Sequence, residues 1–152
     1  MSNEPTIRAA IKTAIESVNN VGVVYDYLRY ASEWDKFLAL FKIKTGPFQG
    51  AIRGWMITCT GFDPIQERQT YGDIFNRDYS YDITGYFGLS DDRATEKEAF
   101  AIVEEVIDAL CAQVDGGEDN VPTLTMFEPR LFGGVVCHVA QIKMSVKGEV
   151  NP

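Results

Sequence analysis

The chain has 152 residues, a length that suits a single domain, and its 45% hydrophobic and 24% charged residues are ordinary for a globular protein. Its formal net charge of −8 argues against sequence-specific nucleic-acid binding, which relies on neutralising phosphates. No signal peptide or apolar run of ~20 residues is present, so we expect a cytosolic protein with no membrane partner.

The first half of the chain is expected to form two helices and two strands. Pro5 precedes an apolar stripe over Ile7–Val18, which predicts a helix. The β-branched and aromatic run Val21–Tyr27 predicts a short strand. Apolar residues at helical spacing predict a short helix over Ser32–Phe41. Ile52–Phe62 reads as a strand with two apolar faces, as in a strand that is covered on both sides.

The segment Asp63–Arg77 is polar and shows no clear period. Long irregular loops are uncommon inside compact domains and are often functional. We therefore expect either a long loop or a hairpin that protrudes from the domain.

The clearest predicted element is a helix over Thr95–Val114. Thr95 and Glu98 have the spacing of a capping box, and Gly116 provides a helix stop. One apolar stripe of a 3.6-residue helix runs along it, formed by Ala99, Phe100, Val103, Ile107, Leu110 and Val114.

Three more strands are expected, at Asp78–Phe87, Val121–Phe127 and Val135–Val146. Residues 1–5 and 147–152 should form loose ends. Several strands follow one another without a helix between them. This order predicts one α+β domain over residues 1–152, with a mostly antiparallel sheet and two main helices packed on one face.

No catalytic, metal or cofactor motif stands out. His138 is the only histidine and lies among apolar residues, so an ordinary histidine satisfied by one hydrogen bond is the favoured interpretation. Asp91, Asp92 and Glu96 lack the pattern of a calcium loop. The three cysteines, Cys59, Cys111 and Cys137, are widely spaced and should be reduced thiols.

The order of elements resembles that of the tail terminator (tail completion) proteins of long-tailed bacteriophages and prophages. The matching elements are the predicted helix 7–18, strands 52–62 and 79–87, helix 95–114 and strand 135–146. The run from Val24-Tyr25-Asp26-Tyr27 through Trp34 to Phe37-Leu38-Ala39-Leu40-Phe41, followed by Ile52-Arg53-Gly54-Trp55, also resembles prophage tail-region proteins.

The resemblance implies a structural protein, not an enzyme, that needs no cofactor. Such proteins form hexameric rings that cap the tail tube, stop its growth and present a surface for head-connector proteins. They would be found in the host cytoplasm during assembly and then in the virion tail. An acidic ring lumen would repel DNA and ease its passage.

A ring interface is heterologous, so the 63–77 segment of one subunit must meet a different patch on its neighbour. The candidate contact residues in this segment are Arg68, Tyr71, Ile74 and Phe75.

The alternative is a small-ligand-binding or enzymatic α+β domain. It predicts a pocket between the 95–114 helix and the sheet, lined by His138 or Tyr81.

Overall fold

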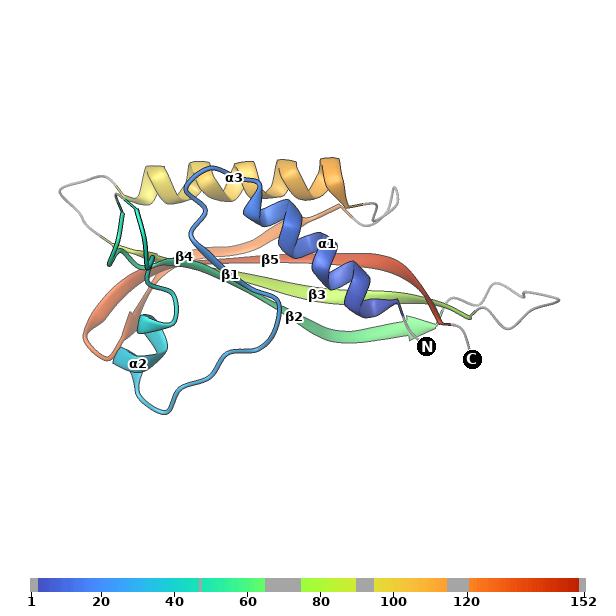
Figure 1. Ribbon diagram of the computed structural model, residues 1–152, viewed down its shortest axis with the longest axis horizontal. Helices are drawn as coiled ribbons and strands as arrows, with labels where there is room; N and C mark the ends of the chain where they lie inside the picture. The colour runs from blue at the N-terminus through green and yellow to red at the C-terminus, as the bar shows by residue number, and fades with distance from the viewer. Residues whose placement is uncertain (1–2, 47, 65–74, 90–94, 115–120, 151–152) are drawn as a thin grey trace.

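The computed structural model describes residues 3–46, 48–64, 75–89, 95–114 and 121–150. Within these ranges five strands form one sheet, in the spatial order β1-β2-β3-β5-β4, and three helices pack against it (Figure 1). In chain order, the elements are α1 (Glu4–Glu16), β1 (Val23–Tyr25), α2 (Trp34–Ala39), β2 (Arg53–Pro64), β3 (Phe75–Gly88), α3 (Thr95–Gln113), β4 (Thr123–Phe132) and β5 (Val135–Val150).

The predicted fold class is confirmed. β1 pairs with β2 in parallel, and the other three described strand pairs are antiparallel. The two long helices, α1 and α3, lie on one face of the sheet, whereas the short α2 lies on the opposite face (Figure 1). None of the helices in the described ranges is long and apolar enough to cross a membrane.

The face under α1 and α3 holds the larger core. α1 contributes Ile11 and Ile15 from its predicted stripe, and α3 contributes Val103 and Leu110. The two helices also meet directly, because the Gln113 side-chain amide donates a hydrogen bond to the Ser17 hydroxyl at 2.9 Å. The strands supply the other side of this core from alternate positions, which include Trp55, Ile57, Tyr81, Ile83, Ala140 and Ile142.

A second, smaller core lies under α2. Phe37, Leu38 and Phe41 pack there on Met56 and Tyr86, on the opposite face of β2 and β3. The two apolar faces predicted for the 52–62 strand are therefore both used, the first under α1 and α3 and the second under α2.

Each core seats an aromatic ring over a glycine of the sheet. Trp55 lies over Gly85, its cross-strand partner, where an added Cβ would come 2.9 Å from the ring. Phe41 lies over Gly54, where an added Cβ would come 2.7 Å from the ring. Both glycines thus leave room for a bulky ring close to the backbone.

Four strands, β2, β3, β4 and β5, extend beyond their predicted bounds, and β4 extends furthest. β4 continues through Pro129 to Phe132, because an edge strand tolerates a proline whose missing N–H is not needed by a neighbour. Gly133 and Gly134, both at positive φ, then connect β4 to β5.

The expectation of loose ends is wrong for part of each terminus. α1 begins at Glu4, and β5 continues to Val150 because its last residues pair with the start of β3.

The 63–77 segment begins and ends in paired strands. Asp63 pairs with Asp78 and Pro64 with Arg77, so β2 and β3 enter the segment as the two arms of a hairpin. Residues 65–74 lie outside the described residues.

Candidate assembly surface

Large apolar side chains are exposed on both faces of the β4–β5 hairpin near its turn, with Trp34 and Val135 on the α2 side and Leu131 and Val136 on the opposite side. Trp34 is 53% exposed, Leu131 68%, Val135 43% and Val136 39%. We name these four residues the hairpin patch. Large apolar side chains that are exposed near one another at a hairpin end are typical of interaction surfaces.

The hairpin patch is held in place from below. The Trp34 ring packs edge-on against Phe132 and Phe37, with centroid distances of 5.2 and 5.8 Å. A Cβ on Gly133 would come 2.9 Å from the Trp34 Cβ, so the hairpin turn lies directly against α2. A preformed surface of this kind loses little conformational entropy when a partner binds.

The connection from β1 to α2 exposes further apolar side chains. Leu28 is 68% exposed and Tyr30 is 82% exposed. Between them, the Arg29 guanidinium lies over the rings of Tyr25 and Tyr27, at 4.6 and 5.2 Å from their centroids. These cation–π contacts order the connection beside α2.

The predicted contact residues fall mostly beyond the described ranges. Arg68, Tyr71 and Ile74 lie outside the described residues, and for Phe75 the structure describes the backbone, which opens β3 opposite Val150. The sequence analysis did not find the hairpin patch. Its signal was the apolar run on both sides of Gly133-Gly134, which a soluble hairpin turn does not need.

His138 lies in the interior beneath the start of α3. It is 5% exposed, its Nε2 lies 3.2 Å from the Thr95 hydroxyl, and its ring stacks on Phe127 at a centroid distance of 5.9 Å. Burial lowers the pKa of His138 below its usual value, although the Glu96 carboxylate acts in the opposite direction. These contacts agree with the favoured interpretation of an ordinary, hydrogen-bonded histidine.

Tyr81 points into the main core. Its hydroxyl donates a hydrogen bond to Glu4 Oε1 at 3.2 Å. Burial raises the pKa of Tyr81 strongly, and the nearby Glu4 carboxylate raises it further, so the phenol stays protonated. Cys137 is also buried, which raises the pKa of its thiol to about 11 and makes it unreactive at neutral pH.

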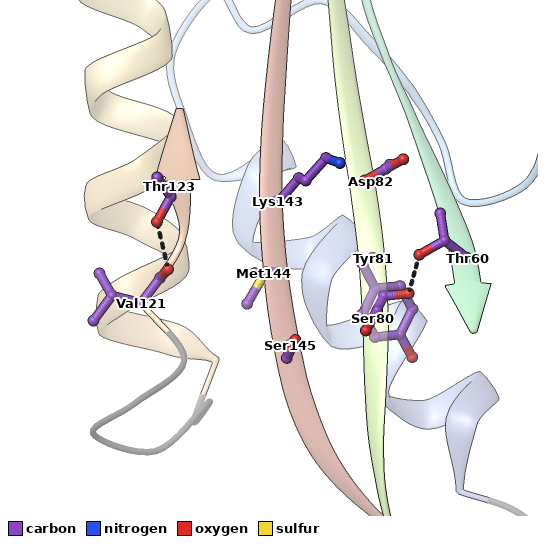
Figure 2. Close-up of a pocket in the computed structure, with 9 residues that line it drawn as sticks. All are labelled: Thr60, Ser80, Tyr81, Asp82, Val121, Thr123, Lys143, Met144 and Ser145. Carbon is purple, nitrogen blue, oxygen red and sulfur yellow. Dashed lines mark hydrogen bonds between the residues drawn. The ribbon is translucent and has the colours of Figure 1, made fainter. Parts of the chain in front are cut away.

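A shallow groove of about 440 Å³ crosses the open part of the sheet, on the face that α2 only partly covers (Figure 2). Asp82 of β3 and Lys143 of β5 are direct cross-strand partners in it, and the Thr60 hydroxyl binds the Ser80 carbonyl at 3.3 Å. Thr123 and Ser145 add hydroxyl groups.

The groove lies apart from His138. Its hydroxyls lie on one face of the sheet, and His138 lies on the other, because successive side chains of a strand alternate between the faces. His138 lines none of the three described cavities. Within the described ranges, no group of three or more histidine, cysteine or acidic side chains is placed to hold a metal ion.

The comparisons with known proteins add no family. No protein-family model matches the chain, and no curated protein matches it in sequence.

Proposed function

We propose that this chain is a structural subunit of a phage or prophage tail. It assembles into a ring, hexameric by resemblance to the tail terminators, caps the tail tube and contributes to head–tail joining. Its partners are other copies of itself, the tail tube protein and the head-connector proteins.

The packing of the elements supports this proposal. The resemblance rests on an N-terminal helix, a mostly antiparallel sheet, an excursion between two strands and a helix before the final strands. The described residues contain these helices and strands in this order, with α1 and α3 side by side on one face (Figure 1). Because one fold can host many functions, this support is an analogy. The argument for assembly must come from the exposed surface.

The observation that carries assembly is the hairpin patch. Trp34 and Leu131 are each more than half exposed, yet the aromatic rings beneath Trp34 hold it rigidly. Central aromatic anchors of this kind dominate the energy of protein interfaces.

Light scattering across concentration, with and without magnesium, tests the proposal together with negative-stain microscopy. We expect a ring-shaped species near six subunits. The Leu131→Asp variant should stay folded but shift to monomer, because it places a charge on the exposed apolar end of the hairpin. Thr125→Asp on the same edge strand is the matched control, since Thr125 is exposed and outside the hairpin patch.

Two results would count against the proposal. A wild-type chain that stays monomeric at every concentration, with magnesium and without it, contradicts ring assembly. A ring that survives Leu131→Asp would show that assembly does not use the hairpin patch.

A further inference from the structure

A second groove, of about 480 Å³, runs beside the outer edge of β1. One wall follows the end of α1, with Val18 and Val21. The other wall is the loop that carries Ile43, Lys44 and Phe48. We name this the β1 groove.

The β1 groove is built from ordered parts. The loop wall is closed by backbone hydrogen bonds from Ile43 N–H to the Ala51 carbonyl at 2.9 Å and from Gly50 N–H to the Ile43 carbonyl at 2.8 Å. On the inner side, the Tyr25 hydroxyl donates to the Leu40 carbonyl at 2.7 Å. The loop wall is therefore ordered, and Tyr25 links β1 to the residue that follows α2.

Its floor is an open strand edge. β1 pairs with β2 on one side, over Val23–Tyr25. Within the described ranges, no backbone hydrogen bond joins the other side of β1 to any element. An edge of this kind accepts an added strand, whose alternate side chains then enter the space between the walls.

The charge of the β1 groove favours an acidic occupant. The chain contains 22 acidic residues, yet the described residues that line this groove include Lys44 and no acidic side chain. Val18, Val21 and Ile43 favour apolar side chains on the same occupant. An extended segment with both kinds of residue would match.

The chain itself carries such a segment. Residues 65–74 include Glu67, Arg68 and Asp73, with a net charge of −1, together with Ile65, Tyr71 and Ile74. β2 ends and β3 begins at the end of the sheet away from α2 and the β4–β5 hairpin (Figure 1).

This segment cannot reach the β1 groove of its own chain. β1 pairs with Gly54–Met56, and Pro64 lies eight residues further along β2, about 26 Å away at ~3.3 Å per residue. Ten residues that must go out and return extend about 17 Å. A second copy must therefore supply the occupant.

We infer that the β1 groove is the acceptor site for residues 65–74 of a neighbouring copy, which add as a strand to β1. This inference rests on the proposed function, because it names the patch that the excursion meets in the ring. The contact joins opposite ends of two molecules, so it is heterologous and can close into a ring.

NMR titration tests the site without requiring assembly. A synthetic peptide of residues 63–76 is added, up to millimolar concentration, to the ¹⁵N-labelled full chain carrying Leu131→Asp. We expect amide shifts at Val21–Tyr25 and at Ile43–Thr45. Lys44→Glu should weaken peptide binding about fivefold, because it replaces an attractive charge with a repulsive one.

Two controls make the result specific. Lys36→Glu reverses an exposed lysine on α2 and should leave the affinity unchanged. A peptide with Glu67→Lys and Asp73→Lys should bind more weakly to the parent chain. The inference is overturned if the amides beside β1 do not shift at millimolar peptide, or if the shifts gather on the hairpin patch instead.

The two proposals fail separately. A ring in light scattering without peptide shifts at β1 would keep the tail function and remove the β1 groove from it. Peptide shifts at β1 in a chain that never forms a ring would keep the β1 groove as a binding site for the segment and remove the tail function.

Discussion

The two faces of the sheet differ in how completely they are covered. Under α1 and α3 the apolar positions are closed in one continuous core, and Trp55, Ile83 and Val103 there are fully buried. On the other face α2 covers one end, and the rest is a polar strip of hydroxyls with Asp82 and Lys143 (Figure 2).

This difference suggests that one face determines the stability of the fold and the other takes part in binding. The closed face buries most of the apolar surface and should determine the free energy of unfolding. The partly covered face carries α2, and the exposed hairpin patch lies at the end of the β4–β5 hairpin next to α2. A change in the closed face should therefore act on folding, whereas a change at the hairpin patch should act on assembly.

The largest expected effect is that of Trp55→Ala in the closed face. Removing this fully buried ring leaves a cavity and should lower the free energy of unfolding by ~3–5 kcal/mol. Urea denaturation followed by circular dichroism measures it. Ser145→Ala, on the polar strip, should change the same quantity by less than ~0.5 kcal/mol. Equal losses from the two variants would refute the division between the faces.

Trp55→Phe sharpens the same comparison. The Trp55 indole N–H is buried and has no hydrogen-bond partner among the described residues. Phe keeps much of the packing and removes that unsatisfied donor, so its cost should be clearly smaller than that of Ala.

The two glycines under aromatic rings compare the two cores directly. Gly85→Ala and Gly54→Ala both push a methyl group into a ring and should each cost ~1–3 kcal/mol. Gly85→Ala should cost more, because Trp55 is enclosed by the larger core, whereas Phe41 lies under a six-residue helix that can shift. Hydrogen exchange should show faster opening of α2 in Gly54→Ala only.

The smallest effect is a pH dependence from His138. Burial lowers the pKa of His138 in the folded state, whereas its pKa in the unfolded chain is near 6.5. At a pH between the folded-state and unfolded-state pKa, the unfolded chain binds more protons than the folded chain. Stability should therefore fall as the pH falls through about 6.5. His138→Gln should remove this slope from urea denaturation curves measured between pH 5 and 8. A slope that persists in the variant would assign it to other groups.

Much of the fold could be predicted because hydrophobic periodicity encodes which side of an element is apolar. It located α3 to within a residue and predicted strands within β3 and β5. It did not encode which partner covers a face. The position of α2 opposite the other helices, and the parallel pairing of β1, depend on contacts between distant segments.

The candidate surface was harder to predict for the same reason. Trp34 fits the apolar stripe of a helix, and nothing in that spacing distinguishes a core residue from one that is half exposed beside a hairpin. The predicted strand ended at Phe127, before Pro129. In the structure Pro129 lies within β4, which is an edge strand. Both errors come from neighbours that local sequence does not specify.

The contact between α1 and α3 has a consequence for the order of synthesis. Ser17 and Gln113 are 96 residues apart, so α1 leaves the ribosome long before its partner helix exists. At ~5–20 residues per second, the isoleucine stripe of α1 stays uncovered for about 5–20 s. The nascent chain thus presents an apolar helix to the cell's chaperones throughout most of its translation, and it can close its main core only when the last third of the chain has been made.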